Sequence, residues 1–126
     1  MKFNIVIIGA GEVGFNLAKS LSKEEHDITV IDIDPIKCQK ITNHIDARVI
    51  EGDGCSQRIL QDIDMSTIDY LIALTRIDEV NLVASKIAKE RGASTLAIIN
   101  KRDGDVTFLV DSSIYLGNGR DIEIAV

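Results

Sequence analysis

Residues 3–21 read FNIVIIGAGEVGFNLAKSL, and this stretch decides the fold. The β-branched, apolar run from Phe3 to Ile8 predicts a buried strand that ends at Gly9. Apolar residues then recur at helical spacing between Val13 and Leu21, which predicts a helix with one apolar face. The segment is therefore expected to form a strand, a tight turn and a helix.

The glycine-rich turn GAGEVG has the spacing of a phosphate-binding loop between a strand and a helix. Gly9 permits the sharp turn, Gly11 lets the backbone approach a pyrophosphate, and Gly14 allows the helix to pack closely on the strand. Glu12 and Val13 begin the helix, whose free N–H groups and positive end attract phosphate. These residues are the first predicted contacts of an adenine nucleotide.

A carboxylate stands in the second apolar run, which predicts a strand over Ile28–Ile33. Asp32 follows the first glycine by about 20 residues, where a carboxylate accepts hydrogen bonds from the ribose hydroxyls of NAD(H) and repels the 2′-phosphate of NADP(H). Asp34 is an alternative ribose contact, although its position before Pro35 also predicts a helix N-cap. The other interpretation is a domain that keeps its glycines for the turn and binds no nucleotide.

Predicted strands and helices alternate along the rest of the chain. Further strands are predicted at Ala47–Ile50, Tyr70–Leu74 and Thr95–Ile99, and further helices at Pro35–His44, after Ser56 and at Asp78–Arg91. The last helix is expected to bury an apolar stripe made of Val80, Val83, Ala84, Ile87 and Ala88. The alternation needs crossover connections, which predict a Rossmann-like, doubly wound α/β fold with a mostly parallel sheet of about six strands and helices on both faces.

The chain beyond Asn100 is less regular. Residues 106–110 fit either a helical turn or a strand, Ser113–Leu116 is predicted as the sixth strand, and residues 121–126 have no assignment. No linker is evident, so residues 1–126 are interpreted as a single nucleotide-binding domain, too small to include a separate substrate domain.

Two further loops are expected at the same edge of the sheet. Asp53 lies in the sequence GDG after the third strand, where it either contacts adenine or ribose or forms an Asx turn. Thr75 and Arg76 follow the fourth strand and are predicted to reach the pyrophosphate or the second nucleoside. For Arg76, a solvated surface charge is an equally open interpretation.

Composition and spacing exclude several classes of protein. The net charge of −6 disfavours nucleic acid as a partner, and no apolar run is long enough for a signal peptide or a membrane span, so a cytosolic protein is expected. Cys38 and Cys55 lack metal-ligand spacing and are interpreted as reduced thiols. His26 and His44 are interpreted as surface residues rather than bases or ligands.

Nothing in the sequence indicates catalysis. Hydride transfer needs a proton donor beside the cofactor, and the chain has neither a Tyr-x-x-x-Lys motif nor a histidine with an evident acidic partner. A binding domain is therefore predicted rather than an enzyme. The alternative from a different class is the cofactor-binding domain of a small NAD-dependent oxidoreductase.

Several segments together are more specific than the glycine motif alone, namely IVIIGAGEVGFNLAKSL, DITVIDIDPIKC, ARVIEGDGCS and DYLIALTRIDEVNLVASKIAKERGA. Through these segments, from Lys2 to about Ile99, the sequence resembles the N-terminal RCK (KTN) domain of Trk and Ktr potassium-uptake regulatory proteins. The loops GDGCS and ALTRIDEVN are the most specific parts of this resemblance.

The resemblance implies a cytoplasmic regulatory subunit at the cytosolic face of the membrane. Its partner would be a potassium transporter or channel, and it would assemble as a dimer and then a ring. The implied ligand is NAD(H), ATP, ADP or AMP, with contacts at Gly9, Gly11, Gly14, Asp32, Asp53 and Thr75. Relatives that use ATP often carry Arg at the position of Glu12, so this carboxylate favours NAD(H). A nucleotide sensor unrelated to ion transport would share the same site residues.

The sequence departs from the family pattern in its last third. Ala97-Ile98 stands where many relatives have Ala-Arg, which removes a phosphate contact, and the usual Ser-Pro-Glu after the sixth strand is not seen. The C-terminal ligand-binding subdomain common in the family is also missing, so we expect either part of a longer protein or a stand-alone domain. An apolar patch left by a missing partner domain predicts that the chain at least dimerises.

Overall fold

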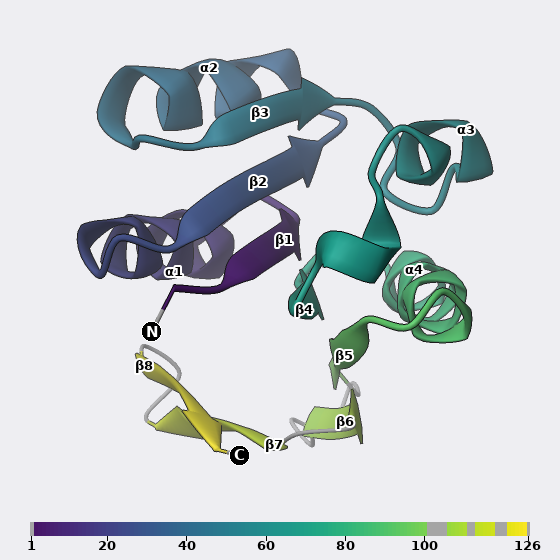
Figure 1. Ribbon diagram of the computed structural model, residues 1–126. Helices are drawn as coiled ribbons and strands as arrows, with labels where there is room; N and C mark the ends of the chain where they lie inside the picture. Colours follow the sequence, from purple (N-terminus) through teal and green to yellow (C-terminus); the bar gives the residue numbers. More distant parts are fainter. Residues whose placement is uncertain (1, 101–105, 111–112, 118–120, 126) are drawn as a thin grey trace.

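The computed structural model describes residues 2–100, 106–110, 113–117 and 121–125, with side chains described within residues 2–93 except 65 and 78. In this part of the chain, helices follow the successive parallel strands (Figure 1). The strands are β1 (Asn4–Ile8), β2 (Asp27–Asp32), β3 (Arg48–Glu51), β4 (Tyr70–Ala73), β5 (Ser94–Asn100), β6 (Val106–Val110), β7 (Ser113–Gly117) and β8 (Asp121–Ala125). The helices are α1 (Glu12–Lys23), α2 (Pro35–His44), α3 (Gln57–Gln61) and α4 (Asp78–Glu90), with a 3₁₀ turn at Met65–Thr67.

The main sheet has six strands in the order β3-β2-β1-β4-β5-β6. Strands β1 to β5 run parallel to one another, and β6 pairs antiparallel with β5. In the centre, Ile7 lies opposite Val30 of β2 and opposite Ile72 of β4. The strand order reverses between β1 and β4, which is the point where doubly wound sheets bind ligands. The predicted Rossmann-like fold is confirmed.

The strands after β5 differ in part from the prediction. The sixth strand of the sheet is β6, at residues 106–110, whereas the predicted sixth strand at Ser113–Leu116 lies in β7 and pairs with β8 in a separate sheet. A parallel sixth strand would need a crossover of about a dozen residues or more. The connection between Asn100 and Val106 is shorter than that, so the chain returns antiparallel to β5.

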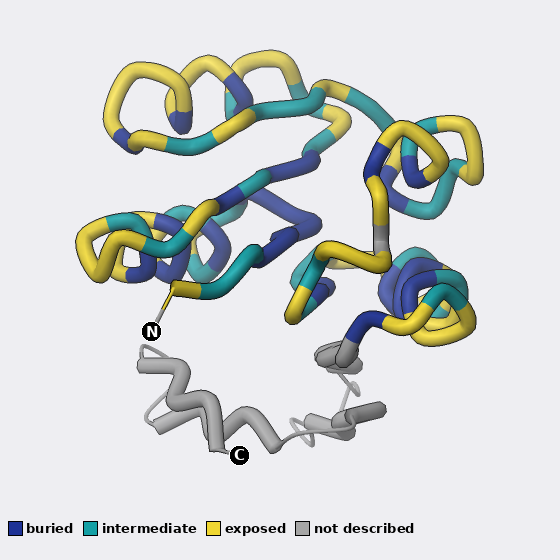
Figure 2. The backbone as a smooth tube through the Cα atoms, in the orientation of Figure 1, coloured by how far each residue is buried: buried dark blue, intermediate teal, exposed yellow. Residues whose placement is uncertain are grey.

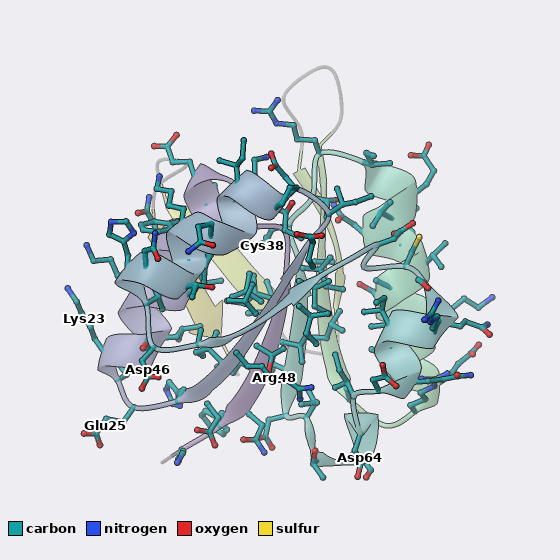
Figure 3. All side chains as sticks on the ribbon, turned by 90° about the horizontal axis from the view of Figure 1, so that it is seen from above. Lys23, Glu25, Cys38, Asp46, Arg48 and Asp64 are labelled. Carbon is teal, nitrogen blue, oxygen red and sulfur yellow. The ribbon has the colours of Figure 1, made fainter. Side chains whose placement is uncertain are left out.

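Two helical layers cover the sheet, and β1 is buried on both of its faces. Figure 3 shows the twisted sheet between these layers, with α1 and α2 on one side and α3 and α4 on the other. Ile5 and Ile7 pack in the core beneath α1 and α2, while Val6 and Ile8 pack in the core beneath α3 and α4. These four side chains are at most 1% exposed, and Figure 2 shows the dark, buried centre of the sheet. Burial on both faces explains why the strand is a continuous apolar run.

Helix α4 buries the expected stripe except for Val83. Ala84 and Ala88 are buried as predicted, but Val83 is 45% exposed, and Asn81 and Ser85 share the buried face. Val80 and Ile87 are half-buried, and Ile87 packs against the same core as Ala84 and Ala88. Neither α4 nor any other helix in the described residues is long and apolar enough to cross a membrane.

Candidate functional site

A cavity of about 280 Å³ opens where the strand order reverses, at the carboxyl ends of β1 to β4. Its volume is close to the lower end of the range of about 300–1,000 Å³ that is usual for small-molecule sites. The predicted contacts that line it are Gly9, Gly11, Asp32, Asp53, Thr75 and Arg76. Glu12, Val13 and Gly14 lie at the start of α1 and do not line it. The topology therefore brings most of the predicted residues to one place.

Gly9 and Gly14 are required by the fold itself. Gly9 has a φ of +108°, and a Cβ there would lie 2.9 Å from the carbonyl carbon of Leu74. A Cβ on Gly14 would collide with the carbonyl oxygen of Gly9, so α1 can approach the turn only when this position is glycine. The turn and the close helix packing expected of these two glycines are both present.

Gly11 has no comparable structural reason to be glycine. It is the N-cap of α1 with an ordinary extended backbone, and a Cβ there would meet nothing within 4 Å. The residue lines the cavity, and among the described residues no side chain caps this end of the helix. The missing side chain leaves the N-terminus of α1 open to an anion such as a phosphate.

The carboxylate of Asp32 ties the glycine turn to the corner after β2. Its Oδ2 accepts the N–H of Ala10 at 2.7 Å, and its Oδ1 accepts the N–H of Asp34 at 2.8 Å. The N–H of Gly9 also donates to the carbonyl of Ile31 at 2.8 Å, which joins β1 and β2 at the same level. Asp32 is half-buried and lines the cavity, so its carboxylate is held in place by the protein backbone.

Asp34 is a helix cap rather than part of the cavity. Its Oδ1 accepts the N–H of Ile36 at 2.8 Å, and Pro35 occupies the first turn of α2. Asp34 does not line the cavity. The N-cap interpretation is confirmed, and the geometry gives no support to Asp34 as the ribose contact.

Asp53 forms the Asx turn that its sequence suggested, and it also lines the cavity. Its Oδ1 accepts both the backbone N–H and the thiol of Cys55, each at 3.0 Å. The thiol bond, followed by the backbone bond, lowers the pKa of the Asp53 carboxyl. The same bond to a carboxylate, followed by burial, raises the pKa of the Cys55 thiol. Asp53 therefore presents an oriented negative charge at one side of the cavity.

Asn81, which the sequence did not single out, holds the loop after β4. The N–H of Thr75 donates to Asn81 Oδ1 at 2.9 Å, and Asn81 Nδ2 donates to the carbonyl of Thr75 at 3.0 Å. The hydroxyl of Thr75 lies 2.7 Å from the same Oδ1. Thr75 thus lines the cavity with its polar groups already engaged, whereas Arg76 lines it as an exposed cation. The signal available in the sequence was a polar residue on the side of α4 that also carries Ala84 and Ala88.

Two exposed isoleucines flank the cavity and were not among the predicted contacts. Ile33 follows β2 and is 71% exposed, and Ile77 precedes α4 and is 56% exposed. Both line the cavity together with Val80 and Lys37. The site therefore combines apolar walls with a few charged groups, as small-molecule sites usually do.

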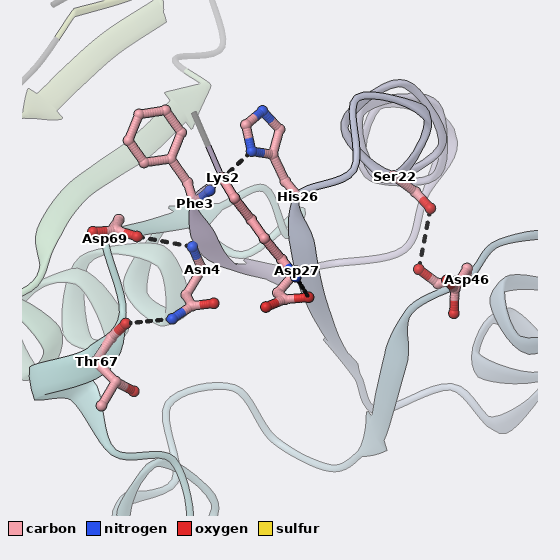
Figure 4. A network of polar contacts seen from close by, with 9 residues as sticks. All are labelled: Lys2, Phe3, Asn4, Ser22, His26, Asp27, Asp46, Thr67 and Asp69. Carbon is pink, nitrogen blue, oxygen red and sulfur yellow. Dashed lines mark hydrogen bonds and ion pairs between the residues drawn. The ribbon is translucent and has the colours of Figure 1, made fainter.

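His26 is not the surface residue that the sequence suggested (Figure 4). Its side chain is only 10% exposed, and its Nδ1 accepts the N–H of Phe3 at 3.0 Å. Its ring stacks on that of Phe3 with the centroids 5.3 Å apart. This contact lies at the amino ends of β1 and β2, where the sequence pattern does not reveal that the loop packs on the strand. His44 is exposed at the end of α2, as expected.

Both cysteines are free thiols. Cys38 is buried in α2, and its thiol donates to the carbonyl of Asp32 at 3.3 Å. Burial, followed by the negative charge of Asp32, raises the pKa of this thiol. Since a nucleophilic cysteine needs a lowered pKa, neither thiol has that character. Within the described residues, no group of three or more His, Cys, Asp or Glu side chains is placed to hold a metal ion.

The doubly wound sheet, the glycine turn at the strand-order reversal and the acidic residue at the end of β2 define a Rossmann-type domain. Within this class, the chain belongs to the TrkA-N domain family, whose model matches residues 5–109.

Curated relatives agree with this assignment. The Trk system potassium uptake protein TrkA of Halomonas elongata is 40% identical over 84 residues, which are 67% of this chain and 18% of that protein. A TrkA homologue of Pyrococcus abyssi is 31% identical over 99 residues, which are 79% of this chain and 44% of that protein. The chain therefore spans less than half the length of these relatives.

Solved structures share the fold at low sequence identity. The NAD(P)-binding domain of an exopolyphosphatase-related protein from Archaeoglobus fulgidus has a TM-score of 0.70 and 14% identity, covering 80% of this chain and 76% of that one. The GsuK channel bound to NAD has a TM-score of 0.69 and 15% identity, covering 82% and 19%. The AMP-bound C-terminal domain of Shewanella denitrificans Kef has a TM-score of 0.59 and 19% identity, covering 71% and 52%.

Proposed function

We propose that this chain is an adenine-nucleotide-binding regulatory domain of a potassium transport system and that its ligand is NAD(H). The observation that carries the proposal is the cavity at the strand-order reversal, where Gly11 leaves the N-terminus of α1 open and Asp32 holds a fixed carboxylate. The names of the TrkA relatives support the link to potassium transport. The NAD-bound GsuK channel supports the choice of ligand.

The proposed ligand spans the cavity from the glycine turn to the corner after β2. Its pyrophosphate binds beside Gly11, where the N–H groups and the positive end of α1 favour phosphate. Its ribose hydroxyls donate to Asp32, whose oxygens keep free lone pairs beyond the two backbone bonds. Its adenine packs against the exposed apolar surfaces of Ile33 and Ile77.

Charge supports NAD(H) over two other nucleotides. The Asp32 carboxylate would repel the 2′-phosphate of NADP(H). Glu12 is exposed in the first turn of α1, where its carboxylate would repel the terminal phosphate of ATP. Lys37 and Arg76 line the cavity and compensate the two charges of a pyrophosphate. AMP and ADP carry fewer phosphates than ATP and are the alternative ligands, as the AMP-bound Kef domain also suggests.

Regulation needs no chemical step in this proposal. A nucleotide that binds one arrangement of the assembled protein more tightly than another shifts the population, and coupling of about 1–3 kcal/mol is typical. The proposed partner is the membrane subunit of a potassium transporter or channel, and the proposed assembly is a dimer that builds a ring. Ile36 and Val83 are 78% and 45% exposed and offer apolar surface to a second copy.

Calorimetric titration of the purified chain with NADH, NAD, NADPH, ATP, ADP and AMP tests this function. We expect NADH or NAD to bind more tightly than NADPH and ATP. The titration with NADH is repeated with a mixture of hydride acceptors, and the absorbance of NADH at 340 nm is expected to stay constant. Acceptor-dependent oxidation of NADH would favour an oxidoreductase instead, and binding of none of the nucleotides would favour a domain that keeps only the fold. Light scattering that shows a strict monomer at high protein concentration would contradict the proposed assembly.

A further inference from the structure

Asn81 is a fully buried polar residue on the inner face of α4. It is 0% exposed and shares this face with Ala84 and Ala88. A buried amide is costly unless its polar atoms are hydrogen-bonded, so its partners show what the residue does.

The amide of Asn81 holds Thr75 at three points. It accepts the N–H of Thr75 at 2.9 Å and donates to the Thr75 carbonyl at 3.0 Å, as the backbone of a neighbouring strand would. Its Oδ1 also lies 2.7 Å from the Thr75 hydroxyl. The same hydroxyl oxygen is 3.2 Å from the N–H of Ile77, so the fixation extends along the loop.

This loop is one wall of the cavity. Thr75, Arg76 and Ile77 all line it, while Asn81 stands behind them. The wall also abuts the glycine turn, because a Cβ on Gly9 would lie only 3.0 Å from the N of Thr75. The width of the cavity between the glycine turn and the loop therefore depends on how firmly Thr75 is held.

We propose that Asn81 is a positioning residue for the nucleotide, which it never touches: it holds residues 75–77 in the shape that the ligand requires. This inference rests on the proposed function. Without the amide, the loop would sample other shapes, and the apparent dissociation constant would rise in proportion to the lost competent fraction. If about one molecule in ten keeps the competent loop, nucleotide affinity falls about tenfold.

The experiment compares wild type with Asn81→Leu, a variant with the same branched side-chain shape and no hydrogen-bonding groups. Ser85→Ala is the matched control, because Ser85 lies on the same buried face, is 4% exposed, and has no hydrogen-bond partner for its hydroxyl among the described residues. Thr75→Val removes the hydroxyl with its bonds to Asn81 and Ile77, and it keeps the two backbone bonds to the Asn81 amide. For each protein, NADH affinity is measured by calorimetry, and hydrogen exchange of the amides of residues 75–77 and of α1 is measured without nucleotide.

We expect Asn81→Leu to weaken NADH binding about tenfold, Thr75→Val to weaken it less, and Ser85→Ala to bind like wild type. Exchange at residues 75–77 should accelerate in Asn81→Leu while α1 keeps its protection, which a general loss of stability would not produce. Wild-type affinity and unchanged exchange in Asn81→Leu would overturn the proposal. If Asn81→Leu does not fold, Thr75→Val decides: NADH affinity equal to that of wild type, with unchanged exchange at residues 75–77, would overturn it.

The outcomes distinguish a failure of the proposed function from a failure of this inference alone. If wild type binds none of the nucleotides, the proposed function is wrong, and the positioning role for a nucleotide is overturned with it. If wild type binds NADH and the variants bind equally well, the proposed function stands and only the role of Asn81 is wrong.

Discussion

The Oδ2 atom of Asp32 accepts a hydrogen bond from the backbone N–H of Ala10 at 2.7 Å, so the residue expected to bind ribose also shapes the glycine turn. The second oxygen accepts the N–H of Asp34 at 2.8 Å and fixes the corner that leads into α2. One carboxylate therefore joins the two loops between which the proposed nucleotide lies. Removing it changes the protein as well as the site, and experiments on Asp32 must separate the two effects.

Asp32→Ala is expected to lose both stability and nucleotide affinity. Each hydrogen bond to a charged group contributes roughly 1.5–3 kcal/mol, and Asp32 accepts two, so the free energy of unfolding should fall by at least the contribution of one such bond. Asp32→Asn keeps one carbonyl oxygen for a backbone N–H, and it should recover part of the stability but little of the affinity for NADH. Urea denaturation and calorimetry on the same samples measure the two effects. If Asp32→Ala kept the stability of wild type, the assigned role of the carboxylate in the turn would be wrong.

Gly14→Ala should destabilise the chain even in the absence of a nucleotide. A Cβ at this position collides with the carbonyl oxygen of Gly9, and neither backbone segment can move without disturbing β1 or α1. Overpacking of this kind costs typically about 1–3 kcal/mol and sometimes more, so we expect a clear decrease in the thermal midpoint or failure to fold. A Gly14→Ala protein with wild-type stability would contradict the close contact between helix and turn.

The reactivity of Cys55 should report on the turn that Asp53 forms. The bond to Asp53 raises the pKa of the thiol, so its contribution to stability is complete below the unfolded thiol pKa and is lost as pH rises through the higher folded pKa. In Cys38→Ser, alkylation of Cys55 by iodoacetamide should therefore need a higher pH in the folded than in the unfolded chain. Asp53→Asn removes the charge and should shift the alkylation profile to lower pH. Identical profiles for the two proteins would show that the thiol does not bind Asp53.

The contribution of the Asp53 carboxyl to stability has the opposite pH dependence. Its pKa is lowered, so its contribution is present above the unfolded carboxyl pKa and is lost only as pH falls through the lower folded value. The turn should therefore persist at neutral pH and weaken in acid, below about pH 4, where an ordinary aspartate becomes protonated.

The central sheet could be predicted because its strands are buried on both faces. Such strands appear as short continuous apolar runs, and Ile5 to Ile8 form one that ends at a glycine. The Asx turn at Asp53 and the N-cap at Asp34 could also be predicted, because these are local hydrogen bonds within a few residues. Beyond β5 the pattern was weaker, and the sequence did not show which of two short runs would pair with β5.

Two kinds of contact could not be predicted from the sequence. Some join segments that are distant along the chain, and others bury a polar residue while an apolar one stays exposed. His26 bonds to Phe3 across 23 residues, so nothing in the local pattern marks it as buried. Asn81 is polar and was not among the residues expected on the buried face of α4, whereas Val83 is apolar and was expected there. The buried amide is stable there because it pairs with the N–H and the carbonyl of Thr75. This pairing becomes apparent only when β4 and α4 are placed together.

The most direct test of the proposed nucleotide site is a calorimetric titration of wild type and Gly11→Ala with NADH, paired with thermal unfolding of both proteins. A methyl group at this position meets no protein atom within 4 Å, and an alanine N-cap costs about 1 kcal/mol relative to glycine. We therefore expect a loss of stability of about 1 kcal/mol. NADH affinity should fall at least about tenfold, because the methyl group would occupy the path of the pyrophosphate. Equal NADH affinities of the two proteins would contradict the proposed site.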